Sequence, residues 1–150
     1  MGVQRLLCMR YGAALLLKIF VEAVKAAAAP CSASVTSGPV KWQPPPTNFV
    51  KLNSDTALAS SRSLVGVCLS LRDDKGWVVG SSGQCFGGTL PPLATEGEAV
   101  LRGLKFALDV GVSSIVVKSD ASSLVDLINV KMVASSEISL VVDEIQSLFV

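Results

Sequence analysis

Three strand-like segments follow one another between residues 49 and 86, and short connections join them. Residues 49–57 alternate in polarity, residues 65–72 form a second segment, and residues 77–86 return after the turn Asp73-Asp74-Lys75-Gly76. Period-two segments joined by so short a turn predict antiparallel neighbours in one sheet. This series constrains the fold more than any other feature of the chain.

A helix–strand–helix order follows the three strands. Gly87-Gly88 and Pro91-Pro92 break the chain first. The later periodicity then predicts a helix at about 94–110, a strand at 114–119, a helix at about 121–131 and an amphipathic helix at about 136–149. An antiparallel series that leads into a β-α-β crossover predicts an α/β fold, with helices packed on a mixed sheet.

The composition excludes several classes of function. The chain has 150 residues, half of them apolar and 17% charged, which suits one folded domain plus an extension. The net charge of +1 gives no overall electrostatic signal for nucleic acid. Histidine is absent, which rules out Ser-His-Asp and Cys-His catalysis and His-containing zinc sites. Any catalysis would depend on carboxylates and a metal ion.

Residues 1–29 predict a basic, Ala/Leu-rich helical extension. Its apolar run is short and Lys18 interrupts it, so we expect neither a membrane span nor a membrane partner. An organellar transit peptide fits the basic composition better than a secretory signal does. An amphipathic helix from a neighbouring domain fits equally well. Without organellar targeting, the expected compartment is the nucleus or cytoplasm.

The four cysteines show no CxxC pair and no disulfide or zinc spacing. Buried free thiols in a reducing compartment are the favoured interpretation. Cys68 and Cys85 fall on adjacent predicted strands, and hairpin geometry predicts that Cys68 lies opposite a residue near Ser81.

Residues 30–48 form a Ser/Pro-rich linker that includes Pro44-Pro45-Pro46. Consecutive prolines favour an extended conformation and stop a helix. The favoured interpretation of this segment is a rigid connection to the first strand. A ligand for a proline-binding module is the alternative. The folded domain is therefore predicted to comprise residues 49–150.

Three acidic residues stand out because each lies on a predicted core element: Asp55, Glu96 and Asp120. Burial of a carboxylate is unfavourable unless the group is paired or bound to a cation. Successive helical residues advance about 100°, so Glu96 projects on the apolar side of its helix, whereas Glu98 lies on the polar side and can pair with Arg102. A favourable position near the helix N-terminus is the alternative explanation for Glu96.

Asp55 and Asp120 also have ordinary explanations. Asp55 shares strand parity with Lys51 and Asn53 and could mark a fraying strand end, and Asp120 suits the N-cap of the following helix. If the first and fourth strands are neighbours, however, the three acids can approach one another. Clustered carboxylate oxygens are suited to Mg²⁺ or Mn²⁺, and such ions can activate water for phosphodiester hydrolysis.

The sequence resembles the ribonuclease H type 1 family, above all the plant reverse-transcriptase-like RNase H domains. The similarity extends over about residues 42–150. The matching segments are Trp42-Gln-Pro-Pro-Pro, Lys51-Leu-Asn-Ser-Asp55, Leu71-Arg-Asp-Asp-Lys-Gly76, Glu96-Gly-Glu-Ala99, Gly103-Leu-Lys-Phe-Ala107, Val117-Lys-Ser-Asp120 and Leu124-Val125.

This resemblance implies a three-layer ribonuclease H-like fold around a five-stranded mixed sheet. It also implies cleavage of the RNA strand of RNA–DNA hybrids by an endonuclease that uses Mg²⁺ held by four carboxylates. Asp55, Glu96 and Asp120 match the first three of these acids. They are the candidate catalytic and metal-binding residues.

The sequence departs from this family in two respects. Its β-β-β-α-β-α order lacks the final strand and helix, which carry the fourth acid, and Thr56 stands where the family usually has glycine. Without the final strand, residues 114–119 would be an exposed apolar edge unless the N-terminal segment or a partner covers them. The chain is therefore interpreted as a C-terminally truncated or degenerate member. A non-catalytic nucleic-acid-binding domain and a transposon-derived remnant are the alternatives to an active hybrid ribonuclease.

Overall fold

The computed structural model describes residues 7–11, 15–23, 42–130 and 137–148. Within them, none of the helices is both long and apolar enough to span a membrane. The elements are β1 (Leu7–Tyr11), β2 (Leu15–Ala23), β3 (Val50–Ala59), a 3-10 turn (Ser60–Arg62), β4 (Leu64–Arg72), β5 (Val78–Gly87), α1 (Pro92–Asp109), β6 (Ser114–Ser119), α2 (Ser122–Asn129) and α3 (Glu137–Ser147).

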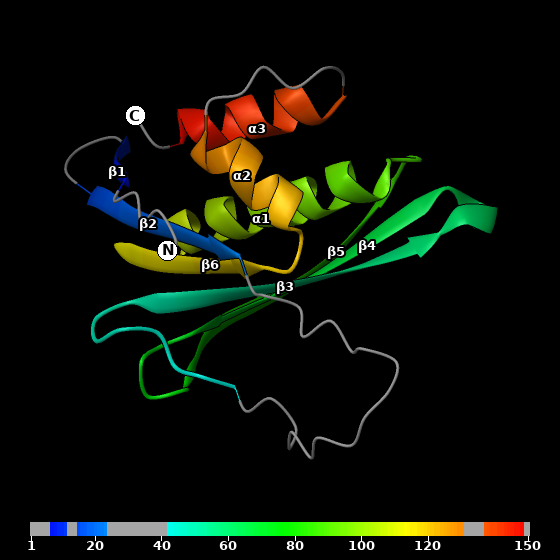
Figure 1. Ribbon diagram of the computed structural model, residues 1–150. Coiled ribbons are helices and arrows are strands. Elements are labelled where there is room, and N and C mark those ends of the chain that lie inside the picture. The colour runs from blue at the N-terminus through cyan, green and yellow to red at the C-terminus, as the bar shows by residue number, and fades with distance from the viewer. Residues whose placement is uncertain (1–6, 12–14, 24–41, 131–136, 149–150) are drawn as a thin grey trace, which may run out of the picture.

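A six-stranded mixed sheet forms the centre of the fold, in the order β1-β2-β6-β3-β4-β5 (Figure 1). β3, β4 and β5 are antiparallel neighbours, as their alternating sequences predict. β6 returns after α1 and pairs parallel with β3, as expected for a β-α-β crossover. The predicted mixed α/β architecture and the order of elements from residue 49 onward are therefore confirmed.

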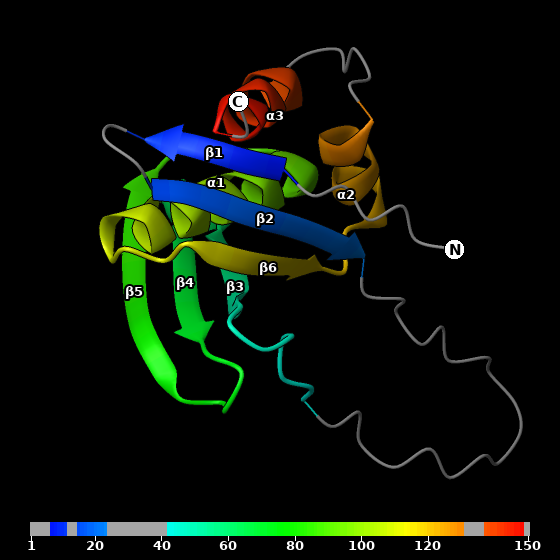
Figure 2. The ribbon, with the colours of Figure 1, turned by 90° about the vertical axis from the view of Figure 1, so that its left-hand side faces the viewer.

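The prediction of a helix in residues 1–29 is wrong for the part that the structure describes. Residues 7–11 and 15–23 form the antiparallel strands β1 and β2. β2 pairs parallel with β6 over six positions, from Lys18 beside Ser114 to Ala23 beside Ser119 (Figure 2). Pairing with the open edge of β6 satisfies backbone groups that an unpaired strand would leave exposed, and this overrides the helix propensity of Ala and Leu.

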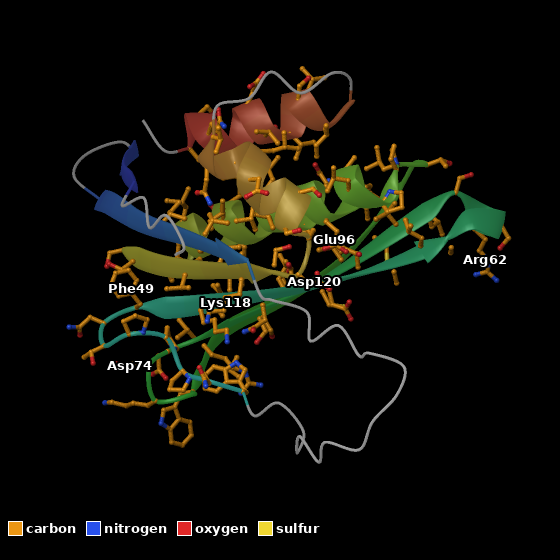
Figure 3. The ribbon with its side chains drawn as sticks, viewed as in Figure 1. Phe49, Arg62, Asp74, Glu96, Lys118 and Asp120 are labelled. Atoms are coloured by element: carbon orange, nitrogen blue, oxygen red, sulfur yellow. The ribbon has the colours of Figure 1, made fainter. Side chains whose placement is uncertain are left out.

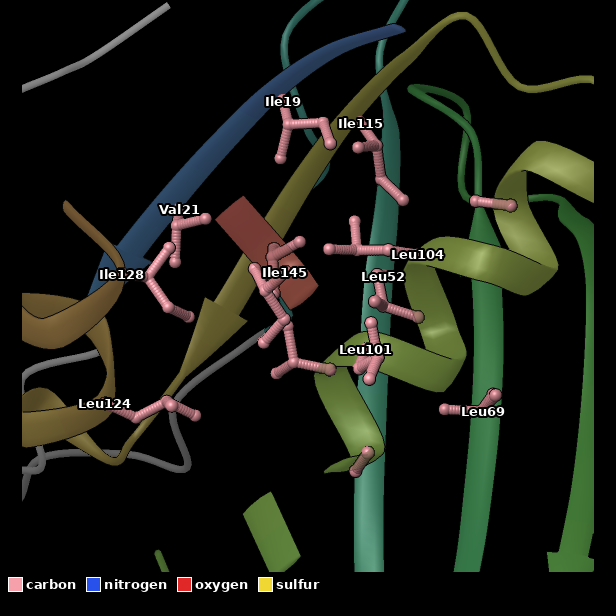
Figure 4. Close-up of a cluster of buried hydrophobic side chains, with 14 of the residues drawn as sticks. Ile19, Val21, Leu52, Leu69, Leu101, Leu104, Ile115, Leu124, Ile128 and Ile145 are labelled. Carbon is pink, nitrogen blue, oxygen red and sulfur yellow. The ribbon is translucent and has the colours of Figure 1, made fainter. Parts of the chain in front are cut away.

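The N-terminal strand contributes to the hydrophobic core as well as to the sheet. Ile19 is fully buried and Val21 is 8% exposed, and both belong to the same core cluster as Ile115 of β6 (Figure 4). The edge of residues 114–119 is thus covered by the N-terminal segment, which was one of the two ways to protect it. The position in the sheet beside β6 is therefore occupied by β2.

The helices α1, α2 and α3 all lie on one face of the sheet, as both ribbon views show (Figures 1 and 2). β3 contacts α1 through Leu52, which is fully buried. Gly103 allows this close approach, because a Cβ atom there would lie only 2.5 Å from Cδ2 of Leu52. This contact sets the distance between α1 and β3.

The opposite face of the sheet carries no helix in the described part of the chain (Figures 1 and 2). Strand parity assigns small and polar residues to this open face, including Asn53, Asp55, Ser70 and Arg72. Such residues need no apolar cover, and antiparallel sheets commonly leave one face in solvent.

The cysteine prediction is partly wrong. Cys68 and Cys85 are free thiols, but both are exposed rather than buried. Both strands place these cysteines on the open face, which explains their exposure. Cys68 lies opposite Gly83, two residues from the predicted position near Ser81.

Residues 42–48 of the predicted linker pack against the folded domain. The Nζ atom of Lys51 donates a hydrogen bond to the carbonyl of Gln43 at 3.0 Å, and it lies 5.0 Å from the centre of the Trp42 ring. Pro45 is buried, and the amide of Asn48 donates to the turn residue Asp74. This segment therefore acts as more than a spacer; residues 30–41 lie outside the described residues.

We predict that Gly103→Ala destabilises the protein. Overpacking costs about 1–3 kcal/mol. This exceeds the gain of about 1 kcal/mol from alanine in a helix interior, because fully buried Leu52 has no space to move. Urea denaturation should show a lower free energy of unfolding. Gly83→Ala is the matched control, since a Cβ there meets nothing within 4 Å. Equal or greater stability of Gly103→Ala would contradict the proposed close contact.

We also predict that Ile19→Ala lowers the free energy of unfolding by about 2–5 kcal/mol, as expected for truncation of a fully buried side chain. Thermal unfolding followed by circular dichroism measures this effect. Leu140→Ala is the control, because Leu140 is 74% exposed and its truncation should change stability by less than about 0.5 kcal/mol. If both variants melt like the unmodified chain, β2 is not part of the cooperative fold.

Candidate functional site

The parallel pairing of β3 and β6 sets the positions of two of the predicted acids. The last paired residues are Leu52 and Val117. Asp55 lies three residues beyond Leu52 in β3, and Asp120 lies three residues beyond Val117, directly after β6 ends, so the two aspartates are equally far along the chain from the last pair. β6 ends at Ser119 while β3 continues, so the strands separate here. In open α/β sheets, ligands bind beyond the carboxyl ends of parallel strands in such crevices.

Asp55 is exposed and belongs to the open face of β3. Its Oδ1 atom accepts a hydrogen bond from the backbone amide of Thr56 at 3.0 Å. Cys68 lies opposite it on β4. Asp55 is thus in the middle of a ten-residue strand, and the alternative that it marks a frayed strand end does not apply.

Glu96 lies in α1, close to the helix N-terminus, and is half-buried. Its Oε1 atom accepts a hydrogen bond from the hydroxyl of Thr56 at 3.1 Å. The residues on either side of Glu96 hold the backbone of α1 in position here. The hydroxyl of Thr95, which is 1% exposed, donates to the carbonyl of Pro91, and Gly97 packs so closely under α3 that a Cβ would lie 3.1 Å from Val141.

The sequence-based distinction between Glu96 and Glu98 agrees with the observed contacts. Glu98 pairs with Arg102 at 2.7 Å, which is the expected interaction four residues along a helix. Glu96 instead faces β3 through Thr56. The predicted sides of the helix therefore agree with the observed contacts of both carboxylates, whereas the Thr56 partner of Glu96 was not predicted.

Asp120 follows β6 and is exposed. The predicted alternative, an N-cap, is not what the structure shows. The N-cap of α2 is Ala121 and makes no side-chain capping bond, and the amide of Ala121 donates instead to the hydroxyl of Ser119. Among the described residues, the carboxylate of Asp120 has no hydrogen-bond or ion-pair partner.

The three acids lie near the same end of the β3–β6 pair, but they do not form a complete set of metal ligands. Figure 3 shows Glu96 and Asp120 at this end, on α1 and after β6 respectively. Asp55 and Thr56 point to opposite faces of β3, so Glu96 is held on the helix side and Asp55 on the open side. Within the described ranges, no three acidic or cysteine side chains are arranged to hold a metal ion.

The donor chemistry of these residues fits a divalent cation, but their arrangement does not. Three carboxylates provide the hard oxygen ligands that Mg²⁺ and Mn²⁺ prefer. One oxygen of Glu96 is already bonded to Thr56 on the other side of the strand from Asp55. The roles of Asp55, Glu96 and Asp120 as metal ligands therefore stay predictions.

Thr56 is the site residue that the sequence interpretation missed. It was noted only as a substitution for glycine, yet it contacts both Asp55 and Glu96. Strand parity indicates only the side of its side chain, because Thr56 shares the helix-facing side of β3 with buried Leu52.

The sequence that carries these residues matches a model of a known protein family. The model of a family described as reverse transcriptase-like matches residues 53–150, which is more than half of the chain and includes all three acids. The chain belongs to the reverse transcriptase-like family. The expected family resemblance is thereby confirmed. In this family member, the N-terminal strands β1 and β2 lie outside the matched region.

Solved structures confirm that this reverse transcriptase-like chain has a ribonuclease H-like fold. RNase H1 from the halophilic archaeon Halobacterium salinarum NRC-1 superposes with a TM-score of 0.60 at 18% identity, over 67% of this chain and 76% of that one. The N-terminal RNase H domain of a Mycobacterium tuberculosis protein gives 0.56 at 18% identity, over 67% and 73%. No curated protein matches the sequence.

Proposed function

We propose that the chain is a ribonuclease H-type hydrolase that binds RNA–DNA hybrids and cleaves the RNA strand with Mg²⁺ or Mn²⁺. The observation that supports this proposal most strongly is that Asp55 and Asp120 are equally far along the chain from the last β3–β6 pair, where the two strands separate. Glu96 lies one hydrogen bond away from the residue after Asp55. Both similar solved structures are named as RNase H proteins.

The chemistry available to the chain agrees with this proposal. Without histidine, the protein lacks the usual general base near neutral pH. A divalent cation, when bound, supplies an activated water and stabilises a leaving oxygen. The exposed carboxylates of Asp55 and Asp120 border solvent, where a cation and a phosphodiester backbone can both approach.

We predict that the purified full chain cleaves the RNA strand of a labelled hybrid in the presence of Mn²⁺ or Mg²⁺. Asp55→Asn should reduce the rate at least about 100-fold, because loss of one preorganised charge at a reacting centre costs about that much. Denaturing gel electrophoresis of the labelled RNA strand measures the cleavage. Asp109→Asn is the matched control, since Asp109 is exposed at the other end of α1 and should leave the rate unchanged.

Two results would reject the hydrolase proposal. One is the absence of cleavage above the Asp55→Asn background at all metal concentrations. The other is an equal loss of activity in Asp55→Asn and Asp109→Asn, since that would indicate a general effect of removing negative charge. Circular dichroism of each variant separates loss of activity from loss of fold.

A second candidate function is non-catalytic binding of hybrid or double-stranded nucleic acid. The hydrogen bond from Thr56 to Glu96 favours it, because this bond holds one of the three acids apart from Asp55. In such a protein, the ribonuclease H-like fold would provide a binding surface without turnover. The low net charge of +1 limits the electrostatic part of the affinity.

For this second candidate, we predict salt-dependent binding of a hybrid with no cleavage. Fluorescence anisotropy should show an affinity that falls roughly tenfold or more between 50 and 200 mM salt, since each neutralised phosphate releases counterions. Asp55→Asn should bind at least as tightly as the unmodified chain, because it removes a negative charge. Absence of binding at low salt would reject both candidates and favour a role in protein association.

A further inference from the structure

Strand β5 forms one edge of the sheet (Figure 2). β4 pairs with it on one side, and within the described ranges no strand pairs with it on the other. The backbone groups along its outer side are therefore available for hydrogen bonds to a further strand. With ten residues, β5 is long enough to bind a partner strand over most of a typical strand length.

This edge lacks the features that usually keep edge strands from pairing. Those features are charged side chains, proline or a short strand. The sequence of β5 from Val78 to Gly87 contains neither a charged residue nor proline. β1, at the other edge of the sheet, has only five residues and includes Arg10. A register shift between Val78 and Gly80 affects only the start of β5, so the part from Gly80 onward is regular.

The regular part of β5 is complementary to a second copy of itself in antiparallel orientation. A two-fold axis at Gly83 places Phe86 of one copy opposite Gly80 of the other, and Gln84 opposite Ser82. The largest side chain then lies beside the smallest residue, and no like charges meet. An axis at Gln84 pairs as many residues, but it places Phe86 opposite Ser82 and leaves Gly80 outside the pairs.

The surroundings of Gly80 suit an aromatic ring from a second copy. On the helix side of β5, a Cβ atom on Gly80 would lie 3.1 Å from Cζ of Phe106 in α1. Phe106 also borders a hollow of about 290 Å³, which is lined by Gln84, Glu98, Arg102, Lys105, Phe106 and Asp109. Phe86 of the other copy would cover Gly80 at this hollow, in the way that aromatic residues cover glycines on neighbouring strands.

The same register covers the apolar residues at the start of β5. Trp77 is 73% exposed, and Val78 and Val79 are exposed as well. Gly87 of the other copy lies opposite Val79, and Leu64, the partner of Gly87 in β4, is another exposed apolar residue. Exposed apolar residues that lie together mark interaction sites. Pairing would bring these two apolar groups together at both ends of the joined strands.

From these observations, we propose that β5 pairs with β5 of a second copy of the chain, antiparallel about a two-fold axis at Gly83. The two six-stranded sheets then form one continuous sheet. The interface does not include Asp55, Glu96 or Asp120, so the proposal is independent of hydrolysis and of nucleic-acid binding.

Analytical ultracentrifugation of the full chain at about 100 µM should show a dimer, because a complex with a Kd of about 10 µM is mostly associated at that concentration. Gly83→Lys should be monomeric, since two lysines would lie directly opposite each other at the axis. Gly83→Ser is the uncharged control and should remain a dimer. A Cβ atom at this position meets nothing within 4 Å, so each substitution is compatible with the fold. A monomeric unmodified chain or a dimeric Gly83→Lys overturns the proposal.

A mixture of two charged variants tests the position of the axis. Gly83→Glu alone should be monomeric, like Gly83→Lys. An equimolar mixture of the two should form a heterodimer, because opposite charges then face each other. If the mixture stays monomeric, residue 83 does not lie opposite itself and the proposed register is wrong.

A disulfide tests the same register without added charge, and it decides the matter if Gly83→Lys does not fold. Ser81 of one copy lies opposite Cys85 of the other, and the Cα atoms of opposite residues are about 4.5–5.5 Å apart, which a disulfide can span. Within one chain the two positions are about 13 Å apart and cannot be linked.

On mild oxidation, Ser81→Cys should therefore form a covalent dimer, which non-reducing gel electrophoresis detects. The control is Ser81→Cys combined with Cys85→Ser, which keeps every other cysteine and should run as a monomer. Equal cross-linking of the two proteins, or cross-linking of neither, overturns the proposal.

Discussion

The parallel pairing of β3 with β6 is the interaction on which the rest of the structure depends. It includes only three residue pairs, Val50–Ile115, Lys51–Val116 and Leu52–Val117. It nevertheless joins the antiparallel series β3-β4-β5 to the strands β6, β2 and β1. The same pairs leave Asp55 and Asp120 equally far along the chain from the last pair, and a slip of one residue would remove this equality and move Asp55 or its neighbours to the other face relative to β6. Register in the core thus determines the composition of the candidate site.

Much of this arrangement could be predicted from the sequence, because local signals agreed with the tertiary structure. The period-two segments and the Asp73–Gly76 turn gave the β3-β4-β5 series, and β6 was predicted with the bounds that the structure has. Helical geometry separated Glu96 from Glu98, and the Glu98–Arg102 ion pair agrees with that separation. In each case, the deciding information lay within a single element.

The wrong or missing predictions concern contacts between elements that are far apart in the sequence. Residues 1–29 have a composition that favours a helix, yet β2 forms because the edge of β6 offers backbone partners and a core for Ile19. Thr56 was overlooked for the same reason. Strand parity predicts on which side of β3 the Thr56 side chain lies, and helical geometry predicts on which side of α1 the Glu96 side chain lies. Only the packing of α1 on β3 brings the two side chains together. A single sequence does not specify such contacts.

The three acids differ in their burial and in the hydrogen bonds that they accept, and this difference is relevant to function. Asp120 is exposed and has no partner among the described residues, Asp55 accepts one backbone bond, and Glu96 is half-buried and bonded to a side chain. The sheet alone can maintain the first two at equal distances along the chain from the last β3–β6 pair. The position of the third depends on one hydroxyl group. The two proposed functions, hydrolysis and binding without turnover, make different demands on this third acid, while the ribonuclease H-like fold is the same for both.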